Sequence, residues 1–110
     1  LVTEFRIEID PRAVEDIESA TEWLLEHAPH KVSEWLGALE TTIGTLKTMP
    51  HRRSHAPENG RWEADIELRQ LLFDAYPSKY RIIFTIIEVD TVRVLQVRHG
   101  SRPFMHESEN

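Results

Sequence analysis

The sequence contains no cysteine and no long apolar run, and each absence excludes a class of protein. Without cysteine the chain has no disulfide, no thiolate nucleophile and no cysteine-ligated zinc or iron–sulfur site. No stretch free of charged residues is longer than 41–46, far too short to cross a bilayer, and the first residues lack the basic and apolar regions of a signal peptide. We therefore expect a cytoplasmic protein without a membrane span, a metal or a cofactor.

Positive charge is also in deficit, but the deficit is uneven along the chain. The 110 residues hold 13 Lys and Arg against 19 Asp and Glu, which gives a formal charge of −6. Residues 1–50 carry 10 acidic and 4 basic side chains, whereas residues 51–110 carry 9 of each. Within 69–102, 6 basic side chains stand against 3 acidic ones. The total argues against nucleic-acid binding by bulk electrostatics, so such binding would have to depend on this local basic segment.

The order of apolar and polar residues predicts a strand followed by two helices. Residues 4–9 alternate apolar and charged side chains, as in a strand with one wet face. Asp10 and Pro11 are typical of a helix start, because the carboxylate accepts from free backbone N–H groups and proline suits the first turn. Apolar side chains then recur at helical spacing over 12–28 and 32–48. Helices with so short a connection form an antiparallel hairpin.

The second half predicts a loop and three strands. Residues 50–65 lose all periodicity and collect proline and glycine, which favours a surface loop. Three strand-like runs follow, at 66–73, 80–88 and 91–98. The expected fold is α+β with the order β-αα-βββ, in which an antiparallel helix hairpin packs on one face of a four-stranded, mainly antiparallel sheet. We expect a single domain over 1–103 and a C-terminal tail over 104–110.

The sheet face turned away from the helices is expected to be open and basic. If the alternate apolar residues of 80–86 face the helices, Arg81 points to the open side. His99 and Arg102 follow where the last strand ends. Guanidinium groups match phosphate oxygens, so these residues predict a phosphate-binding surface. Its further cations are Arg69, Lys79 and Arg98. The alternative is that the arginines only solvate the sheet and pair with nearby acids.

Segments 80–86 and 92–102 combine a Tyr-Arg strand, a hairpin and a closing His-Gly-Ser-Arg element. In this pattern the chain resembles the RelE/ParE superfamily, the toxins of type II toxin–antitoxin modules, also described as plasmid stabilization proteins. An N-terminal strand, a helix hairpin broken by proline and a Trp on the second helix agree, so the resemblance extends over about residues 4–103. It implies a RelE-like fold and a cognate antitoxin, whose disordered segment folds on the toxin.

The resemblance implies one of two activities. RelE-like members bind ribosomes and cut mRNA without a metal, whereas ParE-like members inhibit DNA gyrase and have no catalytic constellation. By motif position, Arg81 and Arg102 match the arginines that contact phosphates in RelE-like toxins. The lysine-rich strand of those nucleases is replaced here by 68–71, and no helix with a catalytic tyrosine follows Pro103.

His99 completes a candidate catalytic set. Transesterification of RNA needs a base, an acid and cations around the phosphorane. A free imidazole titrates near pH 6.5 and serves either proton role. We expect an endoribonuclease in which His99 moves the proton and Arg81 and Arg102 hold the phosphate. In the alternative, His99 only orders the turn at Gly100, and the chain is a gyrase inhibitor or a non-catalytic binding module of the same fold.

Two further groups carry weaker signals. His51 and His55 stand four apart, a spacing that binds metal on a helix, but they lie in the predicted loop. The intervening Arg52 and Arg53 disfavour a cation, so we expect no metal and assign these arginines as secondary RNA contacts. The helix tryptophans, Trp23 and Trp35, are expected to pack in the core, with a partner surface as the alternative.

Overall fold

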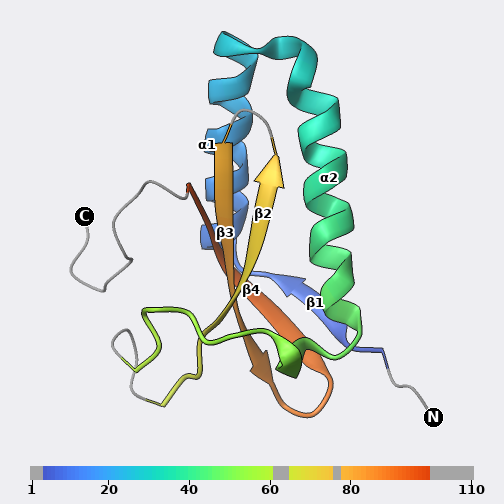
Figure 1. Cartoon of the computed structure of the whole chain (residues 1–110), viewed down its shortest axis with the longest axis vertical. Coiled ribbons are helices and arrows are strands. Elements are labelled where there is room, and N and C mark those ends of the chain that lie inside the picture. The colour runs from blue at the N-terminus through green and yellow to red at the C-terminus, as the bar shows by residue number, and fades with distance from the viewer. Residues whose placement is uncertain (1–3, 61–64, 76–77, 100–110) are drawn as a thin grey trace.

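The computed structural model describes residues 4–60, 65–75 and 78–99 of the chain, which form a helix layer against a sheet (Figure 1). The helices are α1 (Pro11–His27) and α2 (Val32–Gly44). The strands are β1 (Arg6–Ile9), β2 (Arg69–Ala75), β3 (Ser78–Ile87) and β4 (Thr91–His99). Single 3-10 turns are η1 (Pro29–Lys31), η2 (Thr45–Lys47) and η3 (Pro50–Arg52). The predicted α+β fold and the order β-αα-βββ are confirmed.

The sheet has the order β1-β4-β3-β2, in which β1 runs parallel to β4 and the other neighbours are antiparallel. β1 ends beside Val94, and among the described strands none lies on the outer side of β4 beyond that point. Asp16 of α1 replaces the missing strand there, because its Oδ2 accepts from the backbone N–H of Val97 at 2.9 Å. α1 therefore covers both the face and the edge of β4.

The helix boundaries follow from local chemistry. Asp10 caps α1 as predicted, with Oδ1 accepting from the backbone N–H of Arg12 at 2.9 Å. The chain leaves the helix at Ala28, before Pro29, as the pre-proline restriction requires. The second helix was expected as far as residue 48, but α2 ends at Gly44 and the chain continues as η2.

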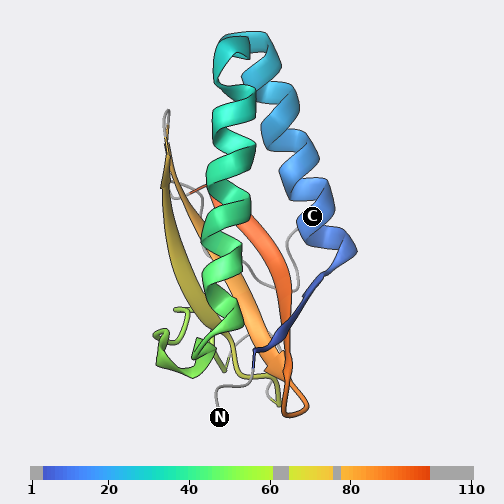
Figure 2. The ribbon, with the colours of Figure 1, turned by 90° about the vertical axis from the view of Figure 1, so that its right-hand side faces the viewer.

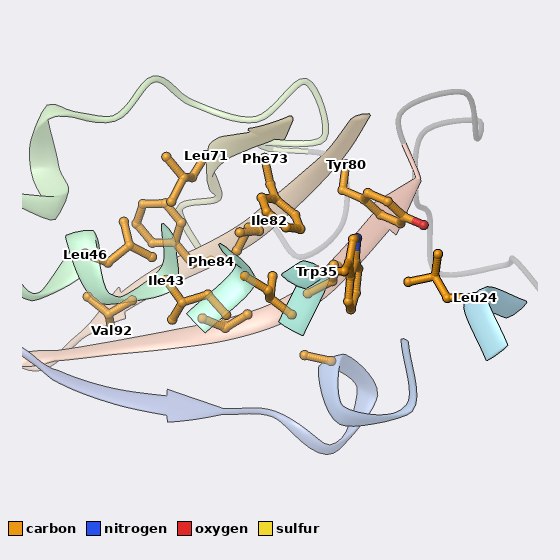
Figure 3. Close-up of a cluster of buried hydrophobic side chains, with 14 of the residues drawn as sticks. Leu24, Trp35, Ile43, Leu46, Leu71, Phe73, Tyr80, Ile82, Phe84 and Val92 are labelled. Carbon is orange, nitrogen blue, oxygen red and sulfur yellow. The ribbon is translucent and has the colours of Figure 1, made fainter. Parts of the chain in front are cut away.

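The main core lies between the helices and the sheet and is built around Trp35 (Figure 3). The indole of Trp35 is buried, with its ring centroid 5.7 Å from Phe73 and 5.5 Å from Tyr80. The core position predicted for this residue is confirmed. Trp23 is instead exposed and stacks on the ring of His27 at 4.1 Å, so the core prediction for Trp23 is wrong.

The opposite face of the sheet is covered around Ile83 and Leu95, so the prediction of a wholly open face is wrong. Ile83 of β3 and Leu95 of β4 form a second buried cluster on this face with Ala56 and Leu68 of the loop. Backbone hydrogen bonds hold the loop in place, including Ala56 N–H to Leu68 O at 2.9 Å. The apolar side chains of this face are too large to leave in water, and the aperiodic segment covers them. In Figure 2 the loop lies on the side of the sheet away from α1.

A β-bulge in β4 decides which side chains share a face. Ile83 is paired with Gln96 and Phe84 with Val94, so Leu95 is an additional residue in β4. The alternation of side chains along β4 shifts by one residue at this point. Val94 before the bulge and Val97 after it both join the helix-side core, while Leu95 points to the other face.

Candidate functional site

Arg81 holds a buried carboxylate, not an open phosphate position. Its Nη1 and Nη2 donate to Oε1 and Oε2 of Glu58 at 3.1 and 2.6 Å, and Nη1 also donates to Gln70 Oε1 at 3.2 Å. Glu58 comes from the covering loop and is fully buried, and the side chain of Arg81 is 12% exposed. A bidentate carboxylate uses the same planar fork that a phosphate would use. The charge of Arg81 is therefore compensated within the chain.

Arg98 lies beside Arg81 on the neighbouring strand. The two residues are partners in the β3–β4 register, and Arg98 is buried. Its Nη1 donates to Gln96 Oε1 at 2.7 Å. We call Glu58, Gln70, Arg81, Gln96 and Arg98 the Arg81 cluster. It forms a hydrogen-bonded polar cluster beneath the covering loop.

His99 lies on the other face of the sheet. It is the register partner of Tyr80, and its ring meets the Tyr80 ring edge-on with centroids 5.2 Å apart. Tyr80 belongs to the helix-side core, whereas Arg81 belongs to the opposite face. The structure therefore does not bring His99 together with Arg81. Arg102, the third member of the expected catalytic set, lies outside the described residues, as do Gly100 and the tail 104–110.

Arg69 ties the covering loop to β2. Its Nη1 donates to the backbone carbonyls of His51 and Arg53 at 3.1 and 2.6 Å, and its Nη2 lies 3.3 Å from Glu67 Oε1. Arg69 lies two residues before Leu71 on β2 and therefore shares its face, which is the helix side and not the side of Arg81. Both terminal nitrogens of the Arg69 guanidinium thus have partners within the chain, and Arg69 does not join the Arg81 cluster.

Two of the other three predicted RNA contacts are more exposed to solvent than Arg81 and Arg98. Lys79 is exposed near the start of β3, and Arg52 is exposed in η3. Arg53 follows η3 and donates from Nη2 to Thr45 Oγ1 at 3.3 Å. None of the three has an ion pair with a described carboxylate.

The loop histidines do not converge. His55 Nε2 lies 2.7 Å from Glu67 Oε2, while the ring of His51 meets Phe5 edge-on at 5.9 Å. Hydrogen bonding by His55 and the charge of Arg69 lower the pKa of the Glu67 carboxyl. Among the described residues, no group of three His, Asp or Glu side chains is placed to hold a metal ion.

Sequence reasoning missed Glu58 and Gln70, which complete the Arg81 cluster. Glu58 follows Pro57 in a segment without periodicity, and nothing in its neighbours marks it as buried. The bulge did leave a signal, because Val94 and Leu95 are adjacent apolar residues that interrupt the alternation of the last strand. That interruption is what places His99 on the helix side.

The comparisons with known proteins agree with this fold. A solved structure described as "Chromosomal ParDE TA system from P. aeruginosa" superposes with a TM-score of 0.66, covering 87% of this chain and 96% of that chain. At 10% identity, this likeness shows the fold alone. Together with the sequence match to the ParE toxin family over residues 7–104, this fold identifies the chain as a toxin of the RelE/ParE superfamily.

The particular family comes from the sequence. The model of the family described as "ParE toxin of type II toxin-antitoxin system, parDE" matches residues 7–104, and the chain belongs to this family. No curated protein matches the chain in sequence. Membership in a toxin–antitoxin class implies an antitoxin as partner. No helix in the described part of the chain has the length and apolar character to span a membrane.

Proposed function

We propose that the chain arrests growth by binding and inhibiting DNA gyrase, as a non-catalytic toxin that its antitoxin neutralises. The observation that carries the proposal is the bidentate pair of Arg81 with the buried Glu58. A phosphate clamp must offer its guanidinium to an incoming anion, and here the chain's own carboxylate occupies the fork. Membership in the ParE family supports the same proposal.

The position of His99 supports a non-catalytic mode of action. Cleavage of RNA needs the proton-transfer group and the phosphate-binding cation at one phosphodiester. His99 packs on Tyr80 on the helix side, and Arg81 lies under the loop on the opposite side. A single phosphodiester cannot reach both groups across a strand. His99 is therefore assigned a packing role at the end of β4.

Ribosome-dependent mRNA cleavage, metal-independent as in RelE-like toxins, is the second candidate. One observation favours it: Arg81 and Arg98 are adjacent on neighbouring strands. Such a pair suits an oxyanion if the covering loop moves away. In this candidate the ribosome and mRNA replace gyrase as the target, and Arg81, Arg98 and Arg102 supply the phosphate contacts.

Induction of the chain in growing cells separates the two candidates. We expect growth arrest with DNA breaks and an SOS response, and intact mRNA in primer-extension assays. His99→Gln should arrest growth as the unaltered chain does, because the imidazole takes no part in chemistry. His27→Gln, on exposed α1, is the matched control for histidine loss. Cut mRNA that disappears in His99→Gln, without DNA breaks, would contradict the proposal.

A further inference from the structure

The chain holds a bulky apolar residue in a conformation that favours glycine, on an exposed corner. Met49 has φ 53° and ψ 49°, in the left-handed region, and its side chain is 58% exposed. Such a backbone costs free energy for any residue with a large side chain and persists where the side chain is used. Glu88 is the other described non-glycine residue with positive φ, and it lies in the tight β3–β4 turn, where this conformation is ordinary.

The contacts of Met49 within the fold do not explain why a methionine and not a glycine occupies this position. It belongs to neither apolar cluster. Its sulfur contacts Arg52 Nη1 at 3.6 Å, and Pro50 follows it directly. A glycine would make the same chain reversal between η2 and η3 at lower cost. The thioether is thus presented to solvent at the expense of local stability.

The segment of the chain that contains Met49 is basic, in a chain that is acidic overall. The sequence has no Asp or Glu between Glu40 and Glu58. Four cationic or titratable side chains flank the methionine within this segment: Lys47, His51, Arg52 and Arg53. We call these four residues and Met49 the basic knob. Within residues 4–60, 65–75 and 78–99, none of its members has an ion pair with a carboxylate, whereas Arg69, Arg81 and Arg93 each have one.

We propose that the basic knob is a docking surface for an acidic segment of the antitoxin, with an apolar side chain of that segment packed on Met49. The inference rests on the chain's role as the toxin of a toxin–antitoxin pair and adds the place and chemistry of one contact. Opposite charges across an interface steer association and fix register. A methionine adapts its shape to an apolar partner.

A polypeptide fits this surface better than a nucleic acid. A phosphate backbone offers nothing apolar to cover an exposed thioether at the centre of the cations. The formal charge of −6 repels both ligands at long range, but a short acidic peptide carries fewer charges than a nucleic acid and is repelled less. A disordered acidic segment that carries a few apolar side chains satisfies both parts of the surface when it folds on binding.

Met49→Gly gives the sharpest test, because stability and binding should change in opposite directions. Glycine relieves the left-handed backbone, so the urea midpoint should stay the same or rise. Affinity for the purified antitoxin encoded by the neighbouring gene, measured by calorimetry, should fall about tenfold or more, as for loss of an interface anchor. Glu88→Gly is the matched control, with the same backbone change in the β3–β4 turn. This turn lies at the same end of the molecule as the segment that follows α2 (Figure 1). Glu88→Gly should bind as tightly as the unaltered chain or more tightly.

Arg52→Glu tests the charge. It should weaken antitoxin binding by about tenfold and reduce the dependence of the affinity on salt. Lys79→Glu is the matched control, because it makes the same change in net charge at an exposed position outside the basic knob, near the start of β3. An equal loss in both variants would mean that net charge and not the basic knob is responsible, and would overturn the proposal.

The remaining outcomes also decide the proposal. It is overturned if Met49→Gly binds the antitoxin like the unaltered chain, if the neighbouring gene product does not bind, or if a 12-nucleotide RNA probe and not the antitoxin loses affinity in Arg52→Glu. Inhibition of gyrase by the free toxin is measured separately and should be the same in both variants. A chain that never inhibits gyrase contradicts the proposed function and leaves the antitoxin measurements as they stand.

Discussion

At the scale of single residues, the role of Arg81 is set by one buried carboxylate, that of Glu58, which its guanidinium binds. Its place on the face away from the helices follows from strand alternation and was predictable. Its partner was not, because Glu58 lies 23 residues away in a segment without periodicity. Sequence patterns report the side of a strand on which a residue lies, but contacts across a loop depend on tertiary packing. The same limit hid the backbone contacts of Arg69.

Removal of Glu58 should strongly destabilise the fold. Glu58→Leu leaves the guanidinium of Arg81 buried without its carboxylate, and we expect a loss of about 3 kcal/mol in the free energy of unfolding. The double variant Glu58→Leu with Arg81→Met removes both charges and should recover most of that loss. Urea unfolding of the three proteins measures both effects. A single variant as stable as the unaltered chain would show that the pair is not a structural element.

The cap of α1 gives a pH-dependent contribution at the same scale. The side-chain hydrogen bond from Arg12 lowers the pKa of the Asp10 carboxyl, and the backbone N–H of Arg12 adds to it. Because the pKa of Asp10 is lower in the folded than in the unfolded chain, its ionised carboxylate adds to the free energy of unfolding. This stabilisation is fully present above the pKa of the unfolded chain, near 3.9, and is lost as the pH falls through the lowered pKa of the folded chain. Asp10→Asn keeps a cap acceptor without the charge. It should be less stable than the unaltered chain at pH 7, with the difference vanishing in acid.

A second substitution at Asp10 measures how much the capping hydrogen bond itself stabilises the fold. Asp10→Ala removes the acceptor for the backbone N–H of Arg12 and should cost about 1 kcal/mol at neutral pH. Thermal or urea unfolding across pH 2 to 7 measures both variants by standard linkage. If the difference in stability between Asp10→Asn and the unaltered chain persists unchanged at the lowest pH, the charge of Asp10 is not its cause.

At the scale of elements, the helices were easier to predict than the sheet faces. Capping and proline signals act locally, so Asp10 and Pro29 marked the bounds of α1 correctly. The bulge at Leu95 shifts the later side chains of β4 to the other face, and its one trace in the sequence is the adjacent apolar pair Val94 and Leu95. The covering loop is similar, because Ala56 and Leu68 form an apolar cap only once the chain has folded.

Ile83→Ala tests whether the loop truly covers the second face. Ile83 is fully buried beneath the loop, so its truncation should cost about 2–5 kcal/mol. Leu72→Ala, on the same face but 68% exposed, is the matched control and should cost less than about 0.5 kcal/mol. Urea unfolding measures both. Equal, small effects would mean that this face is open to solvent in solution.

At the scale of the whole molecule, the charge of −6 is divided between regions with different roles. Acidic side chains cover α1. In the sheet, Arg69, Arg81 and Arg93 are each paired with an acid, as in Arg93 with Glu8 at 2.8 Å. The hydrogen bond to Glu8 raises the pKa of Arg93 further. Lys47, Arg52 and Arg53 of the basic knob have no ion pair among the described residues. A molecule arranged in this way is suited to bind proteins through local contacts and has little general attraction for RNA.

The supercoiling activity of purified DNA gyrase, titrated with the purified chain, tests the proposed non-catalytic action most directly. The account predicts that supercoiling falls and saturates as the chain is added, and that His99→Gln inhibits equally well. The same preparations should leave mRNA intact on translating ribosomes. Full supercoiling at a large excess of the chain, together with mRNA cut by the unaltered protein and not by His99→Gln, would contradict it.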